Sequence, residues 1–244
     1  MTHFLRKTLF SVVAFTMAFV VNAPPPAQAE SLWHQRPSGF GLTNQEFSDG
    51  ASYSTYAVND ISVGGGGWQI NAISETYGRG ISTPSSGTWP AIFSAILNIF
   101  PKSAPLPLAD NDPTAGTVYD ATLTADPVNI GNSIVTLGGL NIALAPGEYW
   151  IGFTPLLDYG SYGQHFQLTA NNWGDPPGFR NPGGGFGYGT AWMTSDSFGF
   201  ASADLNIQIE GAAVPEIDPN SLGSVLALVL GSLGLLERRR LKAA

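Results

Sequence analysis

The sequence predicts an all-β fold: an antiparallel β-sandwich of jelly-roll type, flanked by an N-terminal signal helix and a short C-terminal transmembrane helix. Three observations lead to this prediction. Apolar and polar residues alternate with period two in several segments, as in strands with one buried face. Turn-forming residues, among them 30 glycines and 18 prolines, separate these segments. No credible long helix stands between the chain ends, so we expect a sandwich, with a closed barrel as the alternative.

The N-terminus has the pattern of a signal peptide. Arg6 and Lys7 precede an apolar run over residues 9–21, and Ala27 and Ala29 supply small residues for cleavage. The run is too short to span a bilayer. A buried N-terminal helix is the alternative, but such a helix would have a polar face at helical period, and none is present. We therefore expect signal peptidase to remove residues 1–29.

One domain, residues 30–213, is expected between the end segments, because its length suffices to bury most of its unfolded surface. This region contains four basic and fifteen acidic residues, a formal charge of −11. Nucleic acid is therefore excluded as a partner, because phosphate binding depends on Lys and Arg. The chain has no cysteine, which excludes disulfides and thiolate nucleophiles.

The first strands are expected around a run of glycines. The segments 53–63 and 68–77 are strand-like and flank Gly64–Gly67, so the glycines predict a turn between paired strands, and a flexible linker is the weaker alternative. Between Ile70 and Ile73 the apolar spacing changes from two to three. That change predicts a bulge that shifts the inward face by one residue.

The next two segments differ in how clearly they predict strands. The stretch 91–100 also has spacing that suits a helix, but Pro90, Pro101 and the β-branched residues favour a strand. The segment 117–124 is dense in β-formers and predicts another strand.

Alternation continues to the end of the domain. Residues 140–144 alternate, Pro146 and Gly147 form a turn, and 148–154 alternate again, which predicts a hairpin. In the last strand, 204–210, the odd positions are aliphatic and the even ones are polar. The odd positions should therefore face the core and the even positions water.

The C-terminal apolar run, Leu222–Leu236, is short. At ~1.5 Å per residue it covers roughly 22 Å, against a hydrocarbon core of ~30 Å. The following Arg238, Arg239 and Arg240 would set its orientation by remaining in the cytoplasm. This segment predicts a weak membrane stop for an exported domain.

The tail as a whole, residues 214–244, resembles a PEP-CTERM sorting signal, the tripartite tail of bacterial exosortase substrates. The resemblance rests on Val214, Pro215 and Glu216, the apolar run and the arginine cluster in that order. It implies that an exosortase in the inner membrane recognises the Pro-Glu motif, removes the helix and releases the protein. Ile217 stands where a second proline is usual. A permanent tail anchor is the alternative.

Four pieces of the domain also resemble the β-sandwich ectodomains that often precede such tails. They are YSTYAVNDISV, WQINAISETYG, LAPGEYWIGF and DLNIQIEG. The likeness covers about a third of the domain, and it implies no established activity.

The sequence has no recognisable catalytic motif. His34 and His165 lack zinc-ligand spacing, and Ser195 lacks the G-x-S-x-G elbow. The glycine-rich stretch 183–189 lacks the Lys-Ser/Thr ending of a phosphate loop and predicts a turn. We therefore expect a non-enzymatic protein without a cofactor. A secreted hydrolase with paired carboxylates remains an alternative.

Two groups of residues are candidate binding sites. Asp110, Asn111 and Asp112 could supply oxygen ligands to Ca²⁺, or form a solvated turn. Aromatic residues are frequent over 155–192, and flat rings suit sugar binding, whereas the alternative is that they cover one end of the sandwich. The residues selected for glycan binding are Tyr159, Tyr162, Trp173 and Trp192.

Taken together, the sequence predicts an exported bacterial cell-surface or extracellular-matrix protein. It would pass through an inner-membrane intermediate and be processed by signal peptidase and an exosortase. The alternatives are a surface module that binds extracellular polysaccharide and the secreted hydrolase.

Overall fold

The computed structural model describes residues 29–79, 89–129, 131–171, 174–198 and 203–216. Within these ranges the regular structure consists mainly of strands, and the α-helix described, α2 (Tyr159–Tyr162), has four residues. The strands are β1 (Glu30–Gln35), β2 (Pro37–Thr43), β3 (Glu46–Phe47), β4 (Tyr56–Val63), β5 (Trp68–Arg79), β6 (Ile92–Pro101), β7 (Thr117–Ala125), β8 (Ser133–Leu137), β9 (Ile142–Leu144), β10 (Gly147–Leu157), β11 (His165–Asn171), β12 (Gly178–Arg180), β13 (Met193–Thr194), β14 (Ala203–Leu205) and β15 (Ile207–Ala213). Three 3₁₀ turns, η1 (Ala51–Tyr53), η2 (Pro113–Ala115) and η3 (Ser195–Phe198), join some of them.

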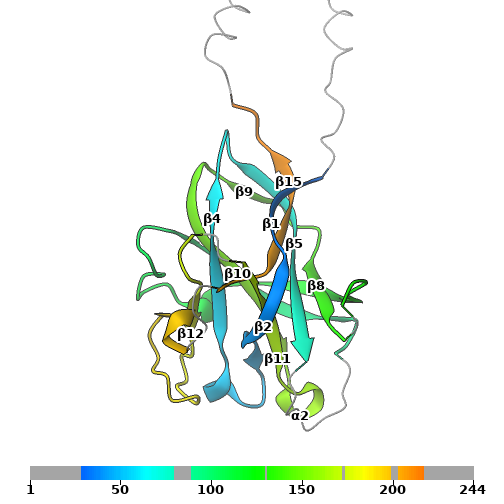
Figure 1. The fold of residues 1–244 in the computed structure, drawn as a ribbon, viewed down its shortest axis with the longest axis vertical. Coiled ribbons are helices and arrows are strands. Elements are labelled where there is room, and N and C mark those ends of the chain that lie inside the picture. Colours follow the sequence, from blue (N-terminus) through cyan, green and yellow to red (C-terminus); the bar gives the residue numbers. More distant parts are fainter. Residues whose placement is uncertain (1–28, 80–88, 130, 172–173, 199–202, 217–244) are drawn as a thin grey trace, which may run out of the picture.

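The strands form one large sheet (Figure 1). Its main path runs β1-β15-β5-β8-β7-β6-β10-β4-β12-β13, and β11 joins β2, β14 and the end of β5. The pairings are antiparallel except for the short contact between β3 and β10. The predicted all-β, antiparallel class is therefore confirmed.

The main hydrophobic core lies inside the curve of this sheet. It contains Ile61 of β4, Ile73 of β5, Phe153 of β10, Val135 of β8 and Ile209 of β15, all at most 1% exposed. β4 and β5 are distant in the strand order, yet their side chains share one cluster. The sheet therefore bends back so that its inner face closes on itself.

Several predicted elements are confirmed. The stretch 91–100 is strand β6, and 117–124 falls within β7. The predicted bulge is also present: Ala72 of β5 pairs with Glu210, and Ile70 pairs with Gly211, so Asn71 is the extra residue. Ile70 and Ile73 consequently both face the core at 0% exposure.

The two predicted hairpins are wrong in their pairing. The glycine run does form a turn, in which Gly67 donates to the Gly64 carbonyl, but β4 pairs with β10 and β5 pairs with β15 and β8. Likewise β9 pairs with β5 and not with β10. At Gly67, where φ is +108°, a Cβ would come within 2.3 Å of the Leu144 carbonyl. The glycines therefore let β9 pass close to the turn, and the two strands that the turn connects pair with other strands instead of with each other.

The last predicted strand is split at Asn206 into β14 and β15. Leu205, Ile207 and Ile209 are buried as expected. However, Asp204 and Asn206, which we expected to face water, are 0% and 2% exposed. Their side of the strand packs inside the protein and is hydrogen-bonded there.

A buried polar cluster lies at this position, beyond the point where the backbone pairing of β15 with β5 ends at Gln208 and Ser74. The Asn206 carboxamide accepts from the Thr76 N–H and donates to the Thr76 carbonyl, as a peptide group would. Asn59 of β4 forms the same two-bond pattern with the backbone of Leu205. These side chains therefore replace missing backbone rungs and satisfy buried peptide groups. We define the cluster as Asn44, Asn59, Glu75, Tyr77, Gln167 and Asn206, each at most 2% exposed.

Glu75 is the ionisable centre of this cluster. Its Oε1 accepts from the Phe153 N–H at 3.1 Å, and its Oε2 lies 2.8 Å from the Tyr77 hydroxyl. Asn44 donates to that hydroxyl and to the Gln167 side-chain oxygen. Burial raises the pKa of Glu75 to about 8, although the hydrogen bonds from Phe153 and Tyr77 act in the opposite direction. The carboxyl group is therefore mostly protonated at neutral pH.

Within the described residues, no helix is long and apolar enough to cross a membrane. The predicted span Leu222–Leu236 and residues 1–28 of the predicted signal peptide lie outside the described residues.

Candidate functional site

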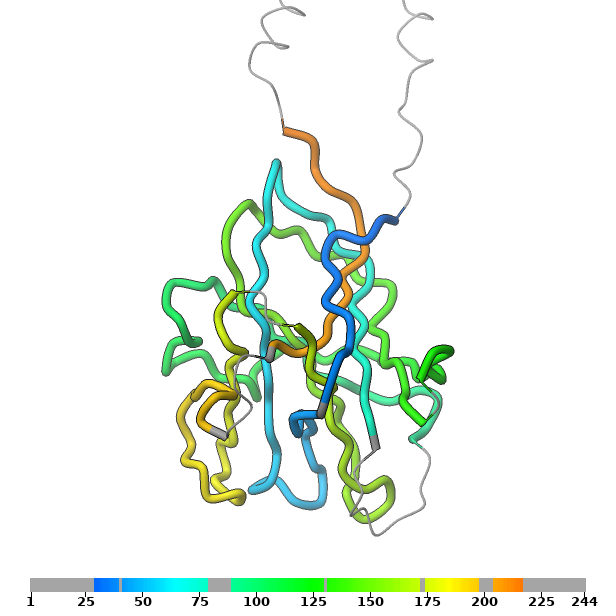
Figure 2. The backbone as a smooth tube through the Cα atoms, viewed as in Figure 1, coloured from blue at the N-terminus to red at the C-terminus, as the bar shows by residue number. Residues whose placement is uncertain are grey.

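The two ends of the described chain emerge together. Glu30 of β1 pairs with Gly211 of β15, and the Ala213 N–H donates to the Glu30 side chain. Figures 1 and 2 show both ends leaving the same end of the domain, whereas α2 lies at the opposite end. The points at which the described chain begins and ends are therefore remote from α2.

The first residues of the predicted sorting signal are accessible. Val214, Pro215 and Glu216 follow β15 and are exposed. Val214 is still tied to the glycine turn, because its N–H donates to Gly67 and its carbonyl accepts from Gly66. Pro215 and Glu216 thus begin the segment that leaves the domain. The predicted orientation residues, Arg238, Arg239 and Arg240, lie outside the described residues.

The aromatic residues predicted for glycan binding do not form one surface. Tyr159 is 38% exposed. Tyr162 packs against the main core, and Trp192 is 7% exposed and packs on Trp150 and Val58. Trp173 lies outside the described residues. Tyr159 is therefore the member of this set that the structure places in an accessible site.

That site is a hollow of about 410 Å³, which we call the aromatic groove. It lies at the α2 end of the domain and combines segments far apart in the sequence. Its lining residues are Phe47, Asp49, Gly50, Tyr53, Tyr159, Gln164 and Phe186.

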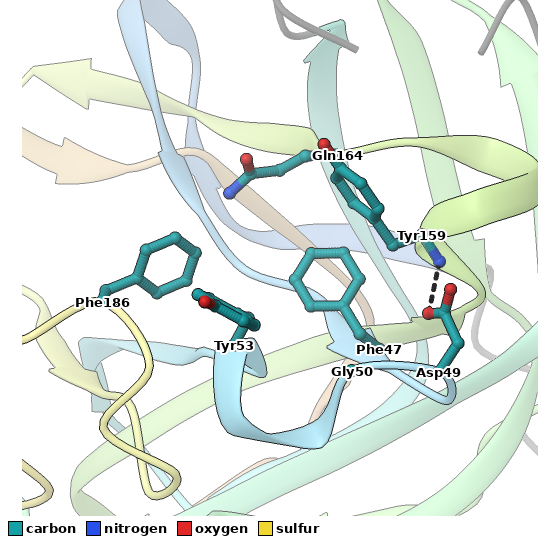
Figure 3. A pocket seen from close by; sticks show the side chains of 7 residues that line it. All are labelled: Phe47, Asp49, Gly50, Tyr53, Tyr159, Gln164 and Phe186. Carbon is teal, nitrogen blue, oxygen red and sulfur yellow. Dashed lines mark hydrogen bonds between the residues drawn. The ribbon is translucent and has the colours of Figure 1, made fainter. Parts of the chain in front are cut away.

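Two pairs of rings form its walls (Figure 3). Phe47 and Tyr159 meet edge to face, with centroids 5.6 Å apart and planes at 83°. Tyr53 and Phe186 form a second such pair at 5.3 Å and 77°. Edge-to-face geometry is the favoured arrangement for aromatic pairs, so each wall is a stable unit.

The Tyr159 wall is positioned by two aspartates. Asp158 caps α2 by accepting from the Ser161 N–H at 2.6 Å. Asp49 accepts from the Tyr159 N–H at 2.7 Å and from the Gly160 N–H at 2.9 Å. These backbone hydrogen bonds lower the pKa of Asp49, so its carboxylate stays ionised and holds α2 beside Phe47.

The Phe186 wall is positioned by the glycine-rich loop. Asn181 donates to the Ser52 and Ser54 carbonyls and accepts from the Phe186 N–H. Gly185 also donates to the Ser52 carbonyl. At Gly183 a Cβ would lie 2.3 Å from the Ser52 Cα. The glycines that predicted only a turn thus allow this loop to lie directly against η1 and to place Phe186 beside Tyr53.

The predicted calcium ligands are arranged as a turn. Asp112 caps η2 by accepting from the Thr114 N–H and hydroxyl, and the Asn111 carbonyl accepts from Arg180 and Trp192. Asp110, Asn111 and Asp112 all line a separate hollow of about 590 Å³. Within the described part of the chain, no three His, Cys, Asp or Glu side chains form a group suited to a metal ion. Calcium binding stays a prediction.

The residues considered for catalysis have different surroundings. His34 lies exposed on β1, and partial burial, followed by repulsion from Arg36, lowers its pKa. His165 is 9% exposed and its ring centroid lies 4.2 Å from that of Trp89. Ser195 is 2% exposed, and its N–H donates to the Pro177 carbonyl. His165 and Ser195 therefore pack within the domain.

Comparison with known proteins finds no matching family model, no matching curated protein and no matching solved structure.

Proposed function

We propose that this chain is a non-enzymatic protein of the bacterial cell surface or extracellular matrix, delivered there through its C-terminal sorting signal. Its β-domain would be exported and held briefly in the inner membrane by the tail. An exosortase would then cut near Pro215 and Glu216 and release it. Signal peptidase would remove the N-terminal segment.

One observation supports this proposal above the others. Pro215 and Glu216 are exposed and follow directly on the last hydrogen bonds of the domain, between Val214 and Gly66–Gly67. A protease could therefore bind this segment without unfolding a strand. Both termini leave at one end (Figure 1), so removal of either segment would leave the aromatic groove intact.

The proposal includes a finer description of the fold. We propose that the curved sheet is a sandwich of jelly-roll type, carried between a signal helix and a short transmembrane helix. The shared core of β4, β5, β8, β10 and β15 supports this arrangement, because side chains from distant parts of the strand order pack face to face.

The test is the fate of the tail in the cells that produce the protein. In a Pro215→Ala/Glu216→Ala variant we expect uncut, membrane-bound protein that keeps Arg238, Arg239 and Arg240. The matched control is Pro146→Ala/Glu148→Ala, which changes an exposed proline and glutamate elsewhere and should be cut normally. Intact mass of membrane and released fractions measures both. Released wild-type protein that retains the three arginines would refute the proposal.

A further inference from the structure

Two aromatic side chains of the aromatic groove are exposed to water. Phe47 is 3% exposed and belongs to the interior, but Tyr53 and Tyr159 are 50% and 38% exposed. Both tyrosines are nevertheless fixed by an edge-to-face partner. Rigid, accessible aromatic rings around a hollow of about 410 Å³ are typical of a small-molecule site.

The polar groups of the groove are few and lie beside the rings. The Gln164 carboxamide extends from the Tyr159 side of the groove toward Phe186 (Figure 3). Its Nε2 donates to the Thr43 hydroxyl at 2.8 Å, which orients the group and leaves Oε1 as a hydrogen-bond acceptor. The two tyrosine hydroxyls add groups that both donate and accept. A ligand with apolar faces and several hydroxyls matches this combination.

The charges of the groove and of the domain indicate that the ligand is uncharged. None of the lining residues is basic, and the domain sequence has a formal charge of −11 from four basic and fifteen acidic residues. An anionic polysaccharide would be repelled. The lining carboxylate, Asp49, lies beyond Phe47 and turns toward the Tyr159 backbone (Figure 3). Both of its oxygens accept backbone hydrogen bonds there, so it is poorly placed as a counter-ion for a cation between the rings.

We propose that the aromatic groove is a binding site for a neutral saccharide, whose apolar ring faces pack on Tyr53 and Tyr159 and whose hydroxyls bond to Gln164. Asp49 is a positioning residue that holds Tyr159. The inference rests on the proposed function in one respect: a protein released at the cell surface would meet extracellular polysaccharide.

The experiment is affinity electrophoresis and titration calorimetry of the purified full chain. The probes are soluble β-1,3-glucan, xylan and galactomannan as neutral polysaccharides, polygalacturonate as an anionic one, and choline as a cation. We expect retardation by at least one neutral polysaccharide. Tyr53→Ala and Tyr159→Ala should each weaken that binding about tenfold, as loss of an aromatic contact predicts. Gln164→Ala should weaken it as well.

The matched control is Tyr188→Ala. Tyr188 is 51% exposed in the same loop as Phe186 but does not line the groove, so the affinity should stay unchanged. Three results would overturn the inference: no neutral polysaccharide binds, choline or polygalacturonate binds instead, or binding survives both tyrosine substitutions. Cleavage of the tail is tested separately, by the intact mass of the protein from cell fractions. Failure of the saccharide proposal can therefore be distinguished from failure of the sorting proposal.

Discussion

In the buried polar cluster, carboxamide and carboxyl groups lie inside the sheet at 2% exposure or less, whereas in the aromatic groove two tyrosine rings remain 38% and 50% exposed. Both regions depart from the usual distribution of polar and apolar side chains, in opposite directions. The polar groups are satisfied by the backbone of neighbouring strands. The rings are only partly covered by each other. The first departure therefore serves the fold, and the second is available to a ligand.

The largest loss of stability is expected when a side chain that replaces a backbone hydrogen-bond partner is removed from the buried polar cluster. Asn206→Ala would leave the Thr76 N–H and carbonyl without their side-chain partner in a buried site. We expect the free energy of unfolding to fall by about 3–5 kcal/mol, because buried peptide groups would lose their partners and a void would remain. Urea denaturation measures this.

The matched control is Asn141→Ala. Asn141 is exposed and accepts one hydrogen bond, from the Gln69 side chain, so its loss should cost less than about 0.5 kcal/mol. Equal destabilisation by the two substitutions would mean that the carboxamide rungs do not stabilise the fold.

A somewhat smaller effect is expected from the ionisable member of the cluster, and it depends on pH. The pKa of Glu75 is about 8 in the folded protein against an ordinary value of 4.5, so between these values the folded state keeps a proton that the unfolded state releases. The stability contributed by Glu75 should therefore be greatest below about pH 4.5, fall through the interval, and level off at its minimum above about pH 8. The fall should be on the order of a few kcal/mol.

Glu75→Gln isolates this contribution. A neutral carboxamide can still accept from Phe153 and bond to Tyr77, so the decline between pH 5 and 8 should disappear. Glu148→Gln, at an exposed site, is the control and should keep the wild-type slope. Asp49 and Asp112 have lowered pKa values and act with the opposite sign at acidic pH, and His34, whose pKa is also lowered, does so at higher pH. The wild-type and Glu75→Gln slopes are therefore compared with each other above pH 5, because His34 contributes equally to both. A slope unchanged by Glu75→Gln would show that Glu75 is ionised in the folded protein.

The same comparison explains what the sequence could predict. β-forming residues and flanking prolines correctly located β6 and β7, and the change of apolar spacing located the bulge at Asn71, because these signals are local. They could not identify which strands pair, and both expected hairpins were wrong. Alternation also distinguishes the apolar face of a strand from its polar face, but it does not show that the polar face is in contact with solvent. At Asp204 and Asn206 that face meets other strands, and the polar side chains hydrogen-bond there.

The groove was harder to predict than the cluster for a related reason. Tyr159 was selected as an aromatic residue in a loop-rich region, but Phe47 and Tyr53 come from a segment far earlier in the sequence, and Phe186 comes from a later loop. The one local signal was the glycine-rich stretch 183–189. Its close approach to Ser52 depends on the tertiary fold, so the sequence alone indicated a turn and not a wall of a site.

The smallest effect on stability is expected in the groove. Tyr159→Ala removes one edge-to-face contact with Phe47 and an accessible ring, so the free energy of unfolding should fall by at most about 1 kcal/mol. Phe47→Ala, which removes a ring at 3% exposure, should cost about 3 kcal/mol or more. Urea denaturation of the two variants compares the exposed and buried members of one aromatic pair. If Tyr159→Ala destabilised the protein as much as Phe47→Ala, the exposed ring would be required for the stability of the fold. Weakened saccharide binding by that variant would then no longer indicate direct contact between Tyr159 and the saccharide.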